Sequence, residues 1–146
     1  MRLPAIPTIG DGPCLANGCS ACCHDTEMLL SEADILRISV HETEPFWHED
    51  DGYLVLRTRD GPPVAGHRGR PCWFLTDNGR CRIHDWRPEG CRLYPAILDA
   101  DRGRARLDDE HCPHTDGFRL PRATDDAVRR LVDRLERERD SRSQQG

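Results

Sequence analysis

The apolar side chains near the C-terminal end of the chain recur with the period of a helix. Aspartates at 125 and 126 would lie in the first turn, where negative charge favours a helix N-terminus. The apolar stripe comprises Ala127, Val128, Leu131, Val132 and Leu135. The pattern predicts an amphipathic helix over about residues 125–139, followed by a flexible tail at 140–146. Its apolar face either docks on the core or forms a seam with a protein partner or a second copy of the chain.

A second helix is predicted to begin after Ser31. Ser31 and Asp34 have the spacing of a capping box, in which each side chain bonds to the backbone N–H of the other residue. Ile35, Leu36 and Ile38 then supply the apolar face that we expect to be buried.

Short strands are predicted on both sides of this helix. Residues 27–30 are mostly apolar, and residues 53–58 alternate apolar and polar side chains, as in a half-buried strand. We expect residues 41–51 between them to form a loop, because proline interrupts any helical pattern there. Phe46 and Trp47 are expected to pack onto the domain.

The middle of the chain predicts a flexible loop followed by a hairpin. Residues 60–71 are rich in glycine and proline, which predicts the loop. Residues 72–75 and 80–84 flank Asp77-Asn78-Gly79, and Asn and Gly tolerate the positive φ angles of a hairpin turn. This pattern predicts that the two flanking segments pair with each other.

A short helix and a second hairpin are predicted next. Pro88 suits the first position of a helix that would carry Cys91, and Pro95 would end this segment. Residues 96–98 and 105–107 are apolar enough to pair as strands across the polar stretch between them.

Composition indicates a single domain with a thin hydrophobic core. Only 36% of the 146 residues are hydrophobic, this fraction includes eight cysteines, and the net charge is −5. A small core of this kind needs an additional link such as a bound metal. We therefore predict a small, cysteine-rich, metal-stabilised α+β domain with short β-hairpins, a few short helices and a C-terminal amphipathic helix. It would span residues 14–139 after an irregular arm at 1–13.

The charged residues exclude several functions. All 21 basic residues are arginine, so the chain has no lysine to form a Schiff base or to complete a P-loop. Arginine and aspartate alternate along most of the chain, which argues against a nucleic-acid-binding surface.

The cellular compartment bears on how the cysteines are interpreted. The N-terminal stretch lacks the apolar run of a signal peptide, and no segment has the length and apolarity of a membrane span. We therefore expect a cytoplasmic protein without a membrane contact. Because the cytoplasm is reducing, clustered cysteines there are better interpreted as metal ligands or redox groups than as structural disulfides.

The cysteines form two sets, and each could complete a tetrahedral metal site. The candidate ligands are Cys14, Cys19, Cys22 and Cys23 in the first set, and Cys72, Cys81, Cys91 and Cys112 in the second. Thiolates are soft ligands that select zinc, copper(I) or iron-sulfur clusters over calcium or magnesium. The two-residue gap between Cys19 and Cys22 lets both sulfurs reach one ion. Neighbouring side chains such as those of Cys22 and Cys23 point apart in extended chain, so either one is spare or the site holds more than one metal.

Nearby residues define the rest of the candidate site. Cys72 and Cys81 bracket the predicted hairpin, which would bring them within a few ångströms of each other, and Cys91 and Cys112 would close the site from distant elements. Four histidines lie within three residues of a cysteine and are either further ligands or groups around the site. They are His24, His84, His111 and His114.

The two cysteine motifs resemble those of a known family. GCSACC, then PCWFLTDNGRCRIHDWRPEGCRLYP and a closing Cys112, are similar to the CxxCxxCC family of YkgJ-type cysteine-cluster proteins, described as zinc- or iron-chelating domains. The resemblance covers roughly residues 14–115. Within the motifs, the matching cysteines are Cys19, Cys22, Cys23, Cys72, Cys81 and Cys91. Cys14 departs from the pattern because four residues separate it from Cys19, and His84 stands where relatives often have tyrosine.

Three functional hypotheses follow. The first is a protein whose cysteine thiolates bind zinc, iron or an iron-sulfur cluster, with the metal needed for the fold because the core is thin; the resemblance implies zinc or iron chelation. An iron- or iron-sulfur-dependent enzyme for redox or group transfer is the alternative, because eight thiols exceed the four of one tetrahedral site; its catalytic residues are unassigned. The resemblance extends distantly to flagellin lysine methylases, but it carries over metal chelation and not their catalysis. A thiol redox switch or interaction module is the third. The chain has no glycine-rich strand-to-helix turn to cradle a nucleotide cofactor, which favours a bare metal-binding domain.

Overall fold

Two small antiparallel sheets and three α-helices form the computed structural model, which describes residues 23–25, 27–113 and 115–145. The predicted α+β fold class is therefore confirmed, while the arm expected at residues 1–13 lies outside the described residues. The first sheet has the order β1-β3-β2 and contains β1 (Leu29–Leu30), β2 (Trp47–Asp50) and β3 (Tyr53–Leu56). The second pairs β4 (Ala96–Asp99) with β5 (Arg104–Leu107). The helices are α2 (Glu32–Ser39), α3 (Glu89–Leu93) and α4 (Arg122–Gln145), with short 3-10 helices η2 (His84–Trp86) and η3 (Thr115–Gly117).

The first hydrophobic core lies between the three-stranded sheet, α2 and the cysteine-bearing loops. Leu30 and Leu54 are paired across β1 and β3, and both point into this core. Its other buried members are Ile38, Phe46, Leu56, Cys72, Phe74, Leu75 and Ile83. Because one cysteine is itself a core residue, the environment of the thiols is partly set by hydrophobic packing.

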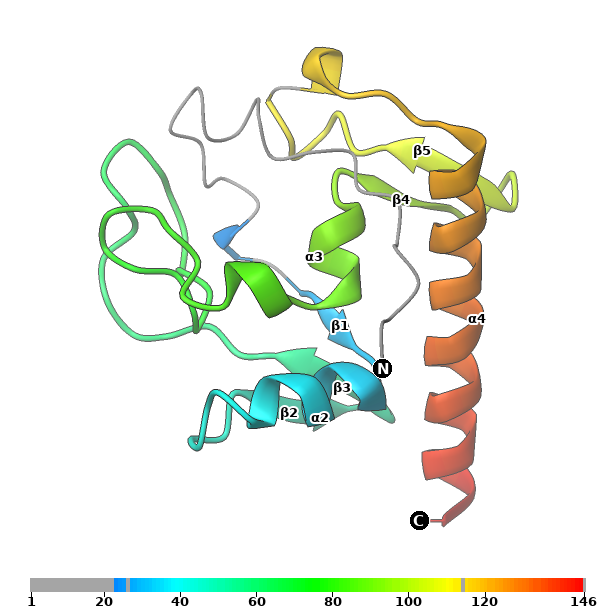
Figure 1. The fold of residues 1–146 in the computed structure, drawn as a ribbon, viewed down its shortest axis with the longest axis horizontal. Coiled ribbons are helices and arrows are strands. Elements are labelled where there is room, and N and C mark those ends of the chain that lie inside the picture. The colour runs from blue at the N-terminus through cyan, green and yellow to red at the C-terminus, as the bar shows by residue number, and fades with distance from the viewer. Residues whose placement is uncertain (1–22, 26, 114, 146) are drawn as a thin grey trace.

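The second core lies under α4. This helix runs along one side of the molecule, with β4 and β5 near its N-terminal half and the other sheet near its C-terminal end (Figure 1). Ala127, Val128, Leu131 and Leu135 are buried, and Val132 is half-buried against them. The predicted stripe is therefore confirmed, and its partners are Leu93, Ala96 and Ala105. No helix in the described part of the chain is both long enough and apolar enough to cross a membrane.

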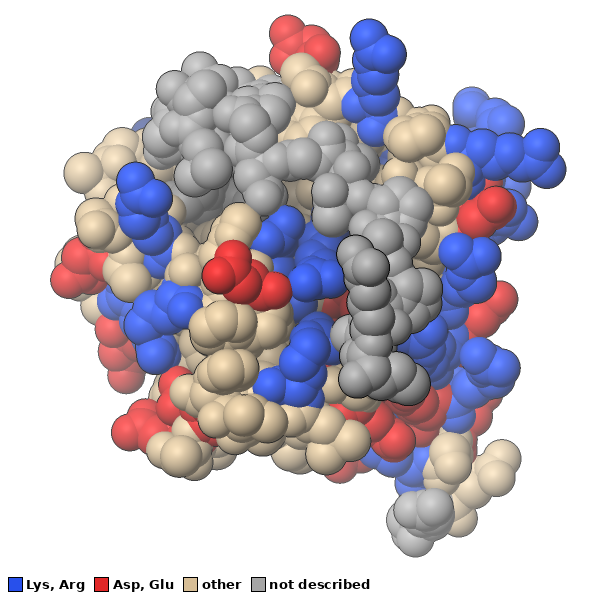
Figure 2. Space-filling view, viewed as in Figure 1, with Lys and Arg blue, Asp and Glu red and all other residues tan. Residues whose placement is uncertain are grey.

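The helix α4 extends beyond the expected end at residue 139 and includes residues 140–145, which the sequence suggested were a tail. Arginines gather along this side of the molecule with acidic side chains between them (Figure 2). Arg139 donates to the carbonyl of Asp51 at 3.0 Å, and Arg142 donates to the carbonyl of Gly52 at 2.7 Å. Arg142 also pairs with Glu32 at 3.1 Å. These bonds connect the last turns of the helix to the turn between β2 and β3 and to the start of α2.

The prediction of a loop over residues 41–51 was wrong at its C-terminal end, where β2 forms. Asp51 and Gly52 have φ angles of 51° and 84° and make a tight two-residue turn into β3. An Asp-Gly pair is a recognised hairpin signal, but β2 carries only one apolar residue, so its strand pattern is weak. Phe46 is buried as expected, and Trp47 is half-buried against the first core.

The capping box of α2 is confirmed, but its buried face differs from the prediction. The Ser31 hydroxyl accepts from the Asp34 N–H at 3.1 Å, and the Asp34 carboxylate accepts from the Ser31 N–H at 3.0 Å. Asp34 and Ile38 lie one helical turn apart and are both fully buried. Leu36, between them in sequence, therefore points outward and is 74% exposed. The buried face of α2 therefore includes the carboxylate of Asp34 and not the side chain of Leu36, which the sequence predicted to be buried.

Asp34 connects α2 to α3 as well as capping α2. Its second carboxylate oxygen accepts from Arg37 Nη2 at 2.7 Å and from the backbone N–H of Glu89 at 3.2 Å. Arg37 in turn donates to the carbonyl of Arg87 at 3.0 Å. A buried carboxylate is stable only when it is paired and hydrogen-bonded, and Asp34 meets this requirement. It therefore fixes where the helix that carries Cys91 begins.

Replacing Asp34 is expected to destabilise the whole domain. Asp34→Ala removes the acceptor of two backbone N–H groups and leaves Arg37 without its buried partner, which should lower the free energy of unfolding by about 3–5 kcal/mol. Urea denaturation followed by circular dichroism measures this change. Asp101→Ala, an exposed carboxylate in the β4–β5 turn, is the control and should change stability by less than about 0.5 kcal/mol. Equal stability of the two variants would contradict the role given to Asp34.

Candidate metal centre

The segment around Cys72 lies between two other segments of the chain. On one side, the Cys72 N–H donates to the carbonyl of Cys23 at 2.7 Å. On the other side, the Trp73 N–H donates to the carbonyl of Arg57 at 3.0 Å, and Thr58 and Cys72 form an isolated antiparallel β-bridge. The end of the first cysteine motif and the start of the second, far apart in sequence, are therefore adjacent in the structure.

A close approach of the backbone reinforces this junction. The Asp25 N–H donates to the carbonyl of Arg70 at 2.8 Å, and the Arg70 N–H returns a bond to the Asp25 carboxylate at 2.7 Å. Gly69 has a φ of 96°, and any Cβ there would overlap the Asp25 carboxylate. The glycine is thus required both by its backbone conformation and by the space beside it.

Cys72 and Cys81 lie on the two sides of the predicted turn. Leu75 and Cys81 form an antiparallel bridge, and the Leu75 N–H donates to the carbonyl of Cys72 at 3.0 Å. Gly79 has a φ of 84°, which is the conformation expected for the glycine of this turn. The turn is confirmed, but the flanking segments pair through one bridge, between Leu75 and Cys81, and do not form the two strands that the sequence predicted.

Three cysteines border the first hydrophobic core. Cys72 is only 7% exposed, and Cys23 and Cys81 are half-buried and pack against the same cluster. Thiolates that are partly removed from water and brought in from different segments fit a soft metal ion. The donor chemistry and its burial are therefore compatible with zinc or iron.

The other cysteines lie on different elements or outside the described residues. Cys91 is half-buried in α3, where the neighbouring Gly90 lies so close to Met28 that a Cβ would overlap the sulfur of Met28. Cys112 is buried after β5, and its N–H donates to the carbonyl of Asp108 at 3.0 Å. Cys14, Cys19, Cys22 and His114 lie outside the described residues.

The described histidines near cysteines have distinct environments. His24 is buried, its Nε2 accepts from the Val64 N–H at 3.1 Å, and its ring stacks on His67 with centroids 5.0 Å apart. In a neutral imidazole whose Nε2 accepts a hydrogen bond, Nδ1 carries the proton. His24 could therefore ligate a metal only by giving up the bond to Val64. His84 lies beside the Arg87 guanidinium, which donates to the carbonyl of His84 at 2.8 Å.

A buried carboxylate next to Cys112 was missed by the sequence analysis. Asp108 accepts from the hydroxyl of Tyr94 at 2.7 Å, and Nδ1 of His111 lies 3.1 Å from both of its carboxylate oxygens. Burial raises the pKa of Asp108, but hydrogen bonds from Tyr94 and His111 outweigh it and hold the pKa below its usual value. The three-residue spacing from Asp108 to His111 was visible in the sequence, whereas the Tyr94 contact was not.

The same turn brings together oxygen and nitrogen donors. One potential ligand atom from each of Asp108, Glu110 and His111 lies within 4.8 Å of the others. Asp108 is buried, while Glu110 and His111 are exposed. Carboxylate oxygens and imidazole nitrogen are harder metal ligands than thiolate sulfur. The described residues near the cysteines therefore offer two different kinds of donor atom.

Asp108 should contribute to stability in a pH-dependent way. Because its pKa is lowered in the folded protein, its contribution is present above the unfolded-state pKa, near 4, and is lost as the pH falls through the folded-state value. Asp108→Asn should lower the free energy of unfolding by about 1–3 kcal/mol at pH 7. Urea titrations of both proteins from pH 3 to pH 7 should show this difference shrinking below about pH 4. A difference that stays constant over the whole range would contradict the assignment.

Comparison with known proteins agrees with the arrangement of the cysteines. The family model CxxCxxCC, described as "Putative zinc- or iron-chelating domain", matches residues 13–114, a range that includes all eight cysteines. No curated protein and no solved structure matches the chain. The match covers most of the sequence, and on this basis the chain belongs to the CxxCxxCC family.

Proposed function

We propose that this protein binds zinc or iron through cysteine thiolates and that the metal is needed for the fold. The proposed ligands are Cys14, Cys19, Cys22, Cys23, Cys72, Cys81, Cys91 and Cys112. The observation that carries the proposal is the 2.7 Å hydrogen bond between the backbones of Cys72 and Cys23, which joins the two cysteine motifs. Membership of a family described as zinc- or iron-chelating supports it.

The ligands would act by closing loops that have little regular structure. Between β3 and β4, the described chain has only η2, α3 and the isolated bridges that involve Cys72, Leu75 and Pro71. Single bridges offset little of the conformational entropy lost when such a segment is ordered. A metal bound by thiolates from two or more of these loops would supply the missing free energy, because binding to a site absent from the unfolded chain stabilises the fold.

An iron- or iron-sulfur-dependent enzyme for redox or group transfer is the second candidate. Eight thiols exceed the four that a closed tetrahedral site needs, so more than one centre or an iron-sulfur cluster can be accommodated. Bound iron would supply the electron transfer or Lewis acidity in such a reaction. The distinction between the candidates is spectroscopic, because thiolate-bound zinc is colourless and iron-sulfur centres absorb visible light.

Metal content is therefore the deciding measurement. Protein purified without oxygen, from cells supplied with both zinc and iron, would be analysed by elemental mass spectrometry and visible absorption. Bound zinc without colour favours the structural or metal-handling role, and bound iron with broad visible absorption favours the enzyme. Protein that contains neither metal at stoichiometric levels would refute the proposal.

Removing the metal should unfold the domain. Structural zinc bound by thiolates provides about 10–16 kcal/mol of apparent binding free energy at neutral pH, which exceeds the stability of a typical small domain. Incubation with a strong chelator under reducing conditions should therefore abolish the far-ultraviolet circular dichroism signal of α4, and readdition of the metal should restore it. An unchanged spectrum after complete metal removal would show that the fold does not depend on the metal.

Substitution of individual residues should separate ligands from neighbouring structural groups. Cys72→Ser replaces a soft sulfur donor with a weak oxygen donor. It should lower the amount of metal bound per chain by at least the amount that one site holds. His24→Gln removes a ring whose Nε2 bonds to Val64, and it should leave the metal stoichiometry unchanged while lowering stability by about 1 kcal/mol. Elemental analysis of both purified variants provides the test. Loss of metal from the His24 variant alone would reverse the two assignments.

A further inference from the structure

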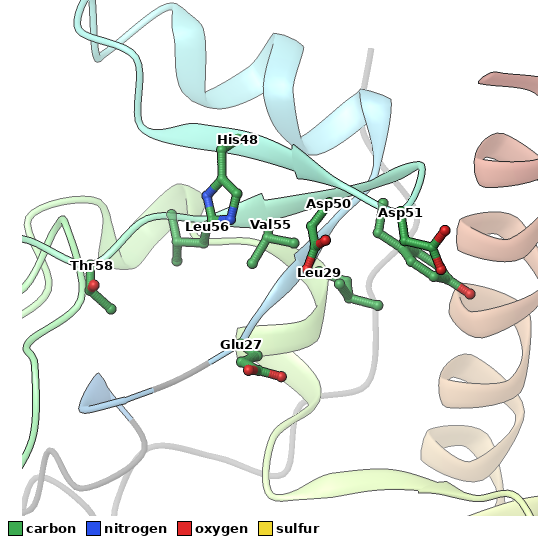
Figure 3. A pocket seen from close by; sticks show the side chains of 9 residues that line it. Glu27, Leu29, His48, Asp50, Asp51, Val55, Leu56 and Thr58 are labelled. Carbon is green, nitrogen blue, oxygen red and sulfur yellow. The ribbon is translucent and has the colours of Figure 1, made fainter. Parts of the chain in front are cut away.

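A groove lies on the face of the three-stranded sheet that points away from the first core (Figure 3). It has a volume of about 380 Å³. Its lining residues are Glu27, Leu29, His48, Asp50, Asp51, Tyr53, Val55, Leu56 and Thr58. None of the cysteines that the structure describes lines the groove, although Thr58 at one end forms an isolated β-bridge with Cys72.

The strand register explains the floor of the groove. Val55 in β3 pairs with Leu29 in β1 on one side and with His48 in β2 on the other, and paired residues share a face of the sheet. Two residues along the strands, Asp50 pairs with Tyr53 on the same face. Leu29 and Val55 therefore form an apolar strip that continues toward the aromatic ring of Tyr53.

Carboxylates stand near this strip. Glu27 precedes β1 and Asp50 ends β2, the two strands that flank β3, and the side chain of Asp50 lies close to those of Val55 and Leu29 (Figure 3). Both carboxylates are exposed, and within the described residues neither takes part in a salt bridge. At Glu27 and Asp50 the groove therefore carries negative charge beside an apolar surface, with no ion-pair partner among the residues that the structure describes.

At the end of the groove near α4, an arginine side chain of the chain itself lies against the lining residues Tyr53 and Asp51. The Arg139 guanidinium lies over the ring of Tyr53, with its central carbon 5.2 Å from the centroid, and pairs with the Asp51 carboxylate at 3.3 Å. The Tyr53 hydroxyl donates a hydrogen bond to the Glu136 carboxylate at 2.8 Å. At this end, an arginine of the chain itself combines apolar contact with carboxylate pairing.

We propose that the rest of the groove binds an arginine-bearing segment of a partner protein. An arginine stem would cover Leu29 and Val55, and its guanidinium would bond to Glu27 or Asp50, repeating the pattern that Arg139 makes beside Asp51. The charge of the groove selects a basic partner and repels acidic proteins and nucleic acids. This inference does not depend on the metal or on the proposed metal-binding function.

Binding of a fluorescent peptide tests the inference. The metal-loaded, full-length protein would be titrated against a short arginine-glycine peptide, followed by fluorescence anisotropy, with a glutamate-glycine peptide of equal length as the negative probe. We expect saturable binding of the arginine peptide that weakens as sodium chloride is raised, because exposed ion pairs are screened by salt. The glutamate peptide should not bind.

Matched variants locate the site. Glu27→Gln with Asp50→Asn removes two charges from the groove, and Asp101→Asn with Asp133→Asn removes two exposed charges elsewhere, so both proteins have the same net charge. The groove variant should bind the arginine peptide about five- to tenfold more weakly, and the control should bind it like the unmodified protein. Circular dichroism would establish that both variants are folded.

Three results would overturn the inference. One is that the groove variant and the control bind the arginine peptide with equal affinity, which would mean that the peptide binds only through non-specific charge attraction. Another is binding of free spermine in the groove with an affinity equal to that of the peptide, which would assign the groove to a small polycation. The last is concentration-dependent dimerisation that is lost in the groove variant, detected by sedimentation velocity, which would assign the groove to a second copy of the chain.

Discussion

The hydrogen bond from the backbone of Cys72 to that of Cys23 determines how the candidate metal centre is assembled. It places the second cysteine motif against the end of the first, and the neighbouring bond from Trp73 to Arg57 attaches the same segment to the continuation of β3. Backbone bonds of this kind orient side chains without depending on a particular ligand. The thiols of Cys23, Cys72 and Cys81 border one hydrophobic core, and a metal bound by them would stabilise loops that the isolated bridges hold only weakly.

Local patterns in the sequence predicted those elements that are formed by local interactions. The Ser31–Asp34 capping box, the β4–β5 hairpin and the α4 stripe each depend on residues close in sequence, and each is present in the structure. The strand β2 was missed because its pairing with β3, rather than its own hydrophobic pattern, holds it in place. The exposure of Leu36 was missed for a similar reason. Nothing near Asp34 in sequence shows that Glu89 and Arg87 will supply a polar environment for α2.

The cysteines were identifiable as candidate ligands from their number and spacing, because few other functions need so many thiols in one small chain. Their adjacency across the motifs could not be derived from spacing, since it arises from bridges between residues far apart in the chain. The environment of Asp108 could likewise be derived from the sequence only in part. Its bond to His111 is local, but the Tyr94 hydroxyl comes from the end of α3. Burial alone raises the pKa of Asp108, and the hydrogen bonds from Tyr94 and His111 lower it.

The length of α4 has a consequence for how the domain unfolds. The helix contacts the β4–β5 sheet through its apolar stripe and fastens the β2–β3 turn through Arg139 and Arg142 at its other end. Each hydrophobic cluster is small, and the second sheet has only two strands, fewer than independent stability usually requires. Because one continuous helix packs in the second cluster and is bonded to the first sheet, unfolding of either part destabilises the other. The two halves of the molecule should therefore behave as one cooperative unit, with a single transition in place of stepwise melting.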